Sequence, residues 1–156
     1  MLHHSFKIVL GMPYDHAIDM WSLGCTLFEL YTGKILFPGR NNNAMLRLMM
    51  ETKGKFAHRT LRRGRFTEEH FDGDLNFISR EKDKITGNEI TKVVSNVAIT
   101  RPIAKSVLNP AETCHLTSEE LERATLFNDF LEKSLELHPE KRWTCRDALS
   151  HPFIKR

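Results

Sequence analysis

The chain has 156 residues, of which 40% are hydrophobic and 28% are charged, a composition typical of one globular domain with a sizeable core. Its net charge of +3 is too small to indicate nucleic-acid binding by itself. No apolar run approaches the roughly 20 residues that a membrane helix needs, and residues 1–7 lack the apolar core of a signal peptide. Cys25, Cys114 and Cys145 form an odd, widely spaced set, which indicates a reducing compartment rather than a disulfide framework.

A strongly apolar helix is predicted over residues 17–31, with Asp15 as its N-cap and Gly33 as the residue that ends it. Its apolar positions lie all round the helix: Ile18, Met20, Trp21, Leu23, Cys25, Leu27, Phe28, Leu30 and Tyr31. We expect such a helix to be buried in the centre of the protein. Asp19 is the exception in this pattern. Either its carboxylate faces solvent near the positive end of the helix dipole, or it is buried and hydrogen-bonded.

The next two segments differ in character. Asn41–Asn43 can cap a second helix, which Gly54 ends and whose apolar positions are Met45, Leu46, Leu48, Met49 and Met50. Residues 55–73 carry no long period, and we predict a loop with short helical pieces. Residues 76–94 contain two β-prone runs separated by Thr86-Gly87-Asn88, which predicts a two-stranded hairpin.

The last third of the chain returns to helical signals. Residues 95–115 are predicted to be irregular, with Pro102 and Pro110 as breakers. Thr117 begins another helix with capping-box spacing, and its apolar spacing continues to Leu137, before His138-Pro139. Thr144 is expected to cap a short last helix.

Several motifs occur in a specific order. Pro13-Tyr14-Asp15, Asp19-Met20-Trp21-Ser22-Leu23-Gly24 and Phe37-Pro38-Gly39 are followed, about 120 residues after the first, by Pro139-Glu140-Lys141-Arg142 and His151-Pro152-Phe153. This series resembles the C-terminal lobe of eukaryotic serine/threonine protein kinases. The Phe-Pro-Gly turn and the insert before the last helices resemble the group of cyclin-dependent, mitogen-activated and splicing kinases. The segments Gly11–Gly39, Lys53-Gly54-Lys55 and His70–Phe77 are most similar to the kinases associated with pre-mRNA processing factor 4.

The resemblance implies a mainly α fold, a kinase C-lobe fragment with a small β-hairpin in the insert and without the N-lobe and catalytic segment. Residues 8–154 would form this partial kinase domain, with residues 1–7 as an atypical N-terminal segment. The implied scaffold residues of the lobe are Asp19, Trp21, Gly24 and Arg142. In the family, the helix Asp hydrogen-bonds the catalytic-loop backbone, and the late Arg pairs with the Glu of an Ala-Pro-Glu motif.

Residues Ser5-Phe6-Lys7 occupy the position that this Ala-Pro-Glu triplet has in the family. Lys7 would then replace the Glu partner of Arg142, and attraction would become repulsion. Removal of one partner of a buried ion pair costs about 3–5 kcal/mol. We therefore expect residues 1–7 not to be the native family sequence, as in a truncation, a splice variant or a wrongly assigned first exon.

The phosphate-transfer motifs of the family are missing from the sequence. It holds no Gly-x-Gly-x-x-Gly loop, and His58-Arg59-Thr60 and Phe71-Asp72-Gly73 only resemble the catalytic-loop and metal-binding motifs, in the wrong order. We therefore predict no catalytic, cofactor-binding or metal-binding residue in this chain, although the full-length family uses ATP and Mg²⁺. Ser22 sits inside a predicted helix and lacks the glycine before it, which excludes a nucleophile elbow. Cys114, His115, His138 and Cys145 lack zinc-ligand spacing.

Residues 53–65 are strongly basic and contain no acid. The cationic side chains are Lys53, Lys55, His58, Arg59, Arg62, Arg63 and Arg65. They could contact phosphate or RNA, but few aromatic residues alternate with them to stack bases. We favour a solvated loop and predict no direct nucleic-acid binding.

The expected function is therefore that of a partial serine/threonine kinase of the splicing type, inactive as this chain alone. The family phosphorylates Ser/Thr in proteins with ATP, which makes it a transferase. Two alternatives remain open: a protein-docking module, supported by the intact segment 41–75, and a non-functional truncated gene product. The resemblance implies protein substrates or splicing-associated partners, no membrane, and the nucleus, with the cytoplasm as a second compartment.

Overall fold

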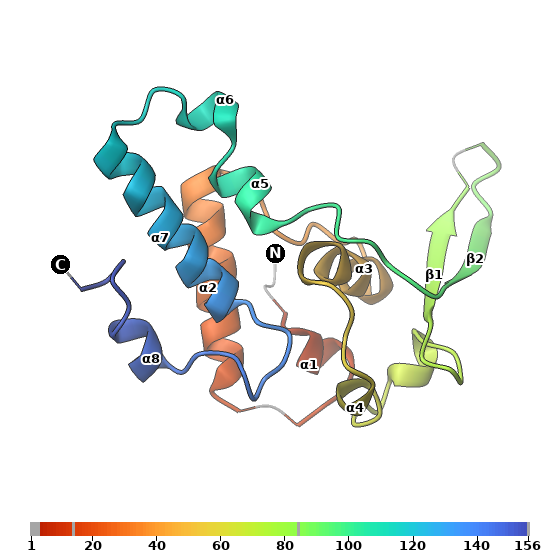
Figure 1. Ribbon diagram of the computed structural model, residues 1–156. Coiled ribbons are helices and arrows are strands. Elements are labelled where there is room, and N and C mark those ends of the chain that lie inside the picture. Colours follow the sequence, from red (N-terminus) through yellow and green to blue (C-terminus); the bar gives the residue numbers. More distant parts are fainter. Residues whose placement is uncertain (1–3, 14, 84, 156) are drawn as a thin grey trace. The chain divides into compact units, whose positions relative to one another are not determined.

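The computed structural model describes residues 4–13, 15–83 and 85–155 (Figure 1). They divide into two compact units. The first comprises residues 15–36 and 101–155, and the second comprises residues 4–13 and 37–100. Tyr14 of the Pro-Tyr-Asp motif lies outside the described residues. Within the described part of the chain, no helix is long and apolar enough to cross a membrane.

The first unit is built from helices alone. Its elements are α2 (Ala17–Thr32), α5 (Ile103–Val107), α6 (Pro110–Thr113), α7 (Ser118–Ser134) and α8 (Cys145–Leu149). Helix α2 packs against α7 and α5 (Figure 1). Met20 of α2, Phe130 of α7 and Ala148 of α8 form a buried cluster, against which Trp143 and Phe153 pack. The predicted long helices and the short last helix are confirmed.

The helix ends in this unit follow the sequence signals closely. The predicted N-cap of α2 was wrong by one residue: His16 is the N-cap, although the Asp15 carboxylate accepts a hydrogen bond from the Ala17 amide at 3.1 Å. Gly33 adopts the left-handed conformation that ends α2, with φ 67°. Capping boxes begin α7 at Thr117 and α8 at Thr144, as predicted.

Two expectations for the last third of the chain were wrong. Residues 95–115 are not uniformly irregular, because Pro102 is the N-cap of α5 and Pro110 is the first residue of α6. Proline is favoured at a helix start, where its missing amide hydrogen is not needed. Helix α7 ends at Ser134, short of Leu137. Leu135 and Leu137 are nevertheless buried, so their apolar spacing reflects the core rather than a continued helix.

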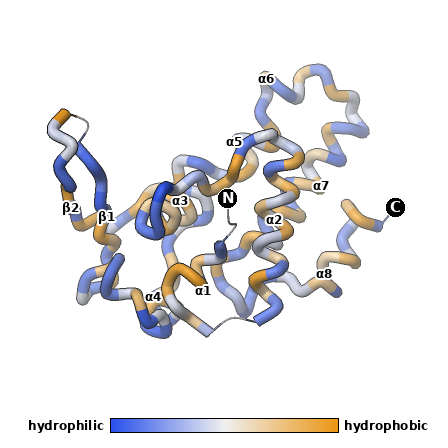
Figure 2. The backbone as a smooth tube through the Cα atoms, turned by 180° about the vertical axis from the view of Figure 1, so that it is seen from behind, coloured by the Kyte–Doolittle hydropathy of each residue, from blue (hydrophilic) through white to orange (hydrophobic). Residues whose placement is uncertain are grey.

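The second unit combines short helices with a hairpin. Its elements are α1 (Phe6–Val9), α3 (Asn42–Lys53), α4 (His58–Leu61), a 3₁₀ helix (Thr67–Glu69), β1 (Phe77–Lys82) and β2 (Glu89–Val94). The strands are antiparallel, with Phe77 opposite Val94 and Lys82 opposite Glu89. The predicted hairpin and second helix are confirmed. Figure 2 shows one short hydrophobic stretch at the tip of the hairpin. Ile85, in the turn between β1 and β2, is 96% exposed.

A chain of aromatic rings forms the core of the second unit. Phe6 packs on Phe56 with ring centroids 5.1 Å apart, Phe56 on Phe71 at 6.3 Å, and Phe71 on Phe77 at 5.6 Å. Ser5 caps α1, where its side chain accepts from the Lys7 amide at 3.4 Å. Residues 5–7 thus begin a helix, and Phe6 is fully buried.

Asn43 connects α3 to the hairpin. Its amide nitrogen donates to the Ile78 carbonyl at 2.8 Å, and its oxygen accepts from the Arg80 amide at 3.0 Å. The same nitrogen lies 3.3 Å from Nδ1 of buried His70. Nδ1 therefore acts as an acceptor, and Nε2 carries the proton, with no hydrogen-bond partner in the described structure.

We expect His70 to make stability depend on pH. Burial lowers the pKa of His70 below its usual range, Glu69 opposes this effect and Arg80 adds to it. The unfolded chain, with a His pKa near 6.5, then binds protons more readily than the folded one. Urea unfolding followed by circular dichroism should show a free energy of unfolding that falls as the pH drops from about 7 through 6.5. His70→Gln should flatten part of this slope, and parallel profiles for the two proteins would contradict the assignment.

Gly24 permits the close approach of α2 and α7. A Cβ at this position would lie 2.9 Å from Leu135 Cγ and 3.0 Å from its Cδ2. Because Leu135 is fully buried, Gly24→Val should lower the free energy of unfolding by about 2 kcal/mol, as overpacked cores do. Urea unfolding followed by tryptophan fluorescence measures this change. Gly73→Val is the matched control, because nothing lies within 4 Å of a Cβ there; equal losses would refute the packing argument.

Candidate functional site

Helix α2 has one buried and one exposed face. Met20, Trp21, Gly24, Cys25 and Phe28 are buried, which places them toward the core of the first unit. Asp19, Leu23, Thr26 and Leu30 follow each other at intervals of three or four residues, lie on one face and are all exposed. The prediction that this helix is buried all round was therefore wrong. None of the described residues covers this face, and Leu30 is 77% exposed.

Arg142 joins the start of α2 to the segment after α7. Its Nη1 donates to the Ala17 carbonyl at 2.8 Å, and its Nε donates to the Glu136 carbonyl at 2.9 Å. The guanidinium carbon also lies 5.0 Å from the centre of the Trp21 ring, within the range of a cation–π contact. The side chain is buried. These contacts make Arg142 a cross-link between segments that are 125 residues apart.

The surroundings of Arg142 shift two pKa values. Burial lowers the pKa of Arg142 to about 10, against the raising effects of Glu136, Asp15 and Cys25. Burial also raises the pKa of the Cys25 thiol to about 12, which the Arg142 charge only partly opposes. Arg142 is therefore a cation and Cys25 a neutral thiol at neutral pH. Such a buried cation is stable because backbone carbonyls and an aromatic face replace its water.

The structure brings three of the four predicted scaffold residues together. Trp21 and Arg142 are in contact, and Gly24 lies one turn further along the same buried face of α2. Asp19 is separate from them. Its side chain is 68% exposed, and its carboxylate lies 3.7 Å from the exposed imidazole of His16. Asp19 therefore faces solvent, which is the first of the two alternatives that the sequence left open.

Two tripeptides that only resemble the catalytic-loop and metal-binding motifs of kinases have structural roles in the second unit. Asp72 of Phe71-Asp72-Gly73 accepts hydrogen bonds from the amides of Asn76 at 2.8 Å and Asp74 at 3.0 Å. The Asn76 amide and side chain hold the pKa of Asp72 below its usual range. Asp72 therefore orders its own loop. His58-Arg59-Thr60 forms most of the short helix α4.

A second polar cluster in the first unit was not predicted as a site. Buried His151 lies 2.9 Å from the Asp129 carboxylate through Nε2, and its Nδ1 accepts from the Phe153 amide at 3.2 Å. Lys133 pairs with the same carboxylate at 2.6 Å and lies over the Trp143 ring at 4.8 Å. Because both nitrogens of His151 are engaged, the cluster fixes the last segment of the chain. The His-Pro-Phe motif was its only sequence signal.

The described residues offer no evident metal centre. Among residues 4–13, 15–83 and 85–155, no group of three or more His, Cys, Asp or Glu side chains is arranged to hold an ion.

The comparisons with known proteins agree with the motif series. The protein kinase domain family matches residues 7–154, and the chain belongs to this family. It is 52% identical over 95% of its length to the serine/threonine-protein kinase prp4 of Schizosaccharomyces pombe. It is 39% identical over 96% of its length to prpf4B of Dictyostelium discoideum, and 34% identical over 97% to ppk15 of Schizosaccharomyces pombe. The chain spans 30%, 18% and 30% of the lengths of these three relatives. The predicted serine/threonine kinase family, of the Prp4 type, is confirmed.

Arg142 can be tested as a cross-link. Arg142→Lys keeps the charge but cannot donate to both Ala17 and Glu136 in this geometry. We expect the free energy of unfolding to fall by about 2 kcal/mol, the scale of lost charge-assisted hydrogen bonds. Urea unfolding followed by tryptophan fluorescence measures the loss. Arg146→Lys, on the exposed side of α8, should change it by less than about 0.5 kcal/mol; a similar loss in both variants would exclude a special role for Arg142.

Proposed function

We propose that residues 8–154 are the C-terminal-lobe part of a splicing-type serine/threonine protein kinase, with residues 1–7 as an atypical N-terminal segment. The observation that carries this proposal is the Asp-x-Trp-Ser-x-Gly helix α2, fastened at its start by buried Arg142. In this proposal Trp21, Gly24 and Arg142 stabilise the lobe. Asp19 is the residue that positions a catalytic loop.

The exposed face of α2 supports the assignment. Leu23 and Leu30, which follow the Asp19 carboxylate in this row, leave apolar surface in water. In a complete kinase domain, the catalytic segment that precedes this helix would cover the row, and its backbone amides would donate hydrogen bonds to the Asp19 carboxylate. The leucines would then be buried, and the helix would have the apolar surroundings that its sequence predicts.

This chain alone is proposed to have no phosphotransfer activity. Phosphoryl transfer depends on positioning and electrostatic stabilisation by a Gly-rich loop, a strand Lys, a catalytic Asp and metal-binding residues. The sequence contains none of these motifs. ATP, Mg²⁺ and the transfer step therefore belong to the full-length kinase. Its proposed substrates are Ser/Thr of splicing-associated proteins, and its proposed compartment is the nucleus.

Two further functions are compatible with the same residues. A protein-docking module would use the second unit, in which α3 and the insert are ordered around their own aromatic core. A non-functional truncated product would be poorly soluble, because the exposed leucines of α2 would promote association. A soluble monomer that melts cooperatively and binds a splicing-associated protein would favour the docking module over the truncated product.

Activity of the chain and of a completed kinase tests the main proposal. The purified chain, incubated with Mg²⁺–ATP and a Ser-rich peptide, should incorporate phosphate at the rate of the enzyme-free blank. Residues 8–156, joined to the upstream kinase segment of S. pombe prp4, should phosphorylate the peptide. Asp19→Asn in this chimera should lower kcat on the order of 100-fold, because a misplaced catalytic loop loses its alignment.

Glu122→Gln is the matched control in the chimera, since Glu122 is an exposed acid on α7. It should leave kcat unchanged. Phosphorylation by the unfused chain would overturn the proposed inactivity. A folded chimera that is inactive, or one in which Asp19→Asn and Glu122→Gln behave alike, would overturn the proposed scaffold role.

A further inference from the structure

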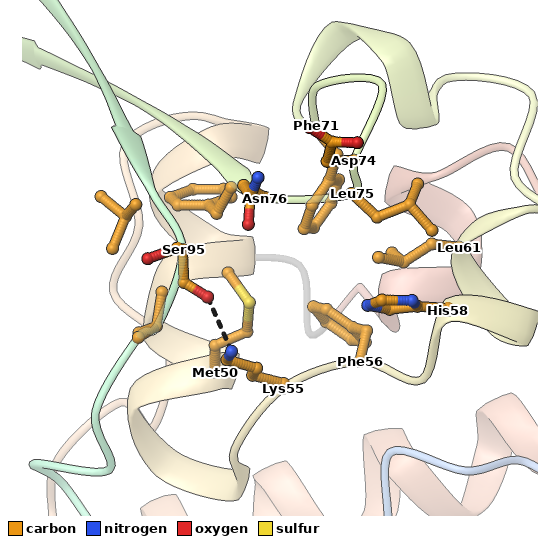
Figure 3. Close-up of a pocket in the computed structure, with 13 residues that line it drawn as sticks. Met50, Lys55, Phe56, His58, Leu61, Phe71, Asp74, Leu75, Asn76 and Ser95 are labelled. Atoms are coloured by element: carbon orange, nitrogen blue, oxygen red, sulfur yellow. Dashed lines mark hydrogen bonds between the residues drawn. The ribbon is translucent and has the colours of Figure 1, made fainter.

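The second unit contains a cavity that the proposed kinase scaffold does not use. Its volume is about 190 Å³, and it lies between α3, the basic segment, the loop before β1 and the chain after β2 (Figure 3). Met50, Phe56, Leu61, Phe71 and Phe77 line it, and each is buried. These residues form an apolar floor that belongs to the core of this unit, and polar side chains line the rest of the cavity: Lys55, His58, Asp74, Asn76 and Ser95.

The cavity is preformed. Phe71 packs edge-on against both Phe56 and Phe77, with interplanar angles of 87° and 62°. Leu75, which also lines the cavity, has the left-handed φ of 63° that is uncommon for a branched residue. Its amide donates to the Asp72 carbonyl at 2.9 Å, which holds this conformation. A site that is already shaped loses little entropy when a ligand enters.

The size of the cavity sets the size of its occupant. Sites for drug-sized ligands have volumes of about 300–1,000 Å³, whereas an apolar cavity of about 150 Å³ accommodates benzene. A cavity of about 190 Å³ therefore fits one large apolar side chain, such as Leu, Met or Phe.

The charges at the rim are distributed unequally. Lys55 and His58 line one side of the cavity, and Figure 3 shows Asp74 on the opposite side of the view. The Lys55 ammonium donates to the Ser95 carbonyl at 2.6 Å, which keeps its charge at the entrance. Exposed Arg59 and Arg62 follow in the same segment, which has no acidic residue between Lys53 and Phe66. This side of the rim complements negative charge.

We infer that this cavity is a docking site for an acidic protein segment. One Leu, Met or Phe side chain of the segment packs on the apolar floor of the cavity, and acidic residues on one side of that anchor face Lys55 and His58. The opposite flank, near Asp74, excludes acids. RNA fits less well, because the basic segment 53–65 carries few aromatic residues to stack bases. The inference does not depend on phosphotransfer, so a binding assay tests it independently of the proposed function.

Fluorescein-labelled ten-residue peptide pools are the probe. Four pools carry either Leu or Ala at the centre, with Asp and Glu placed on the N-terminal or the C-terminal side only, and a ten-nucleotide RNA is the fifth ligand. Fluorescence polarisation with the full chain should show that one Leu pool binds at least about tenfold more tightly than the Ala pool with the same acid placement. The same Leu pool should also bind at least about tenfold more tightly than the Leu pool whose acids lie on the other side. Binding should weaken as salt rises.

Three variants separate the cavity from general charge attraction. Val97→Trp should fill the cavity and Lys55→Glu should reverse the rim charge, each weakening the Leu pool about tenfold or more. Lys105→Glu, an equal charge change at an exposed position of α5, should have no effect. Circular dichroism checks that each variant is folded, and Ser95→Trp replaces Val97→Trp if that variant is not.

The methyl group of Met50 provides a readout without any substitution. Because Met50 lines the cavity and is 2% exposed, the NMR signal of its methyl group should shift when the Leu pool binds. The inference is overturned if the Leu and Ala pools bind equally, if the Met50 signal does not move, or if the RNA binds more tightly than every peptide pool.

Discussion

The buried guanidinium of Arg142 is the contact on which the first unit depends. It connects the Ala17 carbonyl at the start of α2 with the Glu136 carbonyl beyond α7, and it stacks on Trp21. The start of a helix leaves its first amides without helical partners, whereas its carbonyls are bonded within the helix. Arg142 therefore adds a second donor to the Ala17 carbonyl and ties the start of α2 to the Glu136 segment. The low pKa of Arg142, about 10, reflects how far it is removed from water.

Close packing between α2 and α7 adds to the cross-link that Arg142 makes. Gly24 allows α7 to approach α2, and Leu135 fills the space that a side chain would need. His151 is fixed from the other side by Asp129, whose carboxylate also accepts from Lys133. Hydrogen bonds of Arg142 and His151 and the close packing of Leu135 on Gly24 thus hold α2, α7 and the last segment of the chain together. A rigid α2 of this kind suits a helix proposed to position other segments.

The second unit is organised by aromatic packing instead of a buried ion. Phe6, Phe56, Phe71 and Phe77 form a continuous series of ring contacts, and Asn43 ties α3 to the hairpin. The cavity beside these rings and the acid-free segment 53–65 both belong to this unit. The proposed docking of a protein segment would use this unit and does not require nucleotide binding.

The sequence by itself determined the family, the long helices, their caps and the hairpin. Helical spacing, the Thr117 and Thr144 capping boxes and the left-handed Gly33 act over a few residues, so they are visible without a structure. The motif order identified Asp19, Trp21, Gly24 and Arg142 as a group. Only the tertiary structure decided which of them meet, that α2 keeps one exposed face, and that α7 stops before Leu137. Those outcomes depend on contacts between residues far apart in the chain, such as Arg142 with Ala17, and no local pattern encodes such contacts.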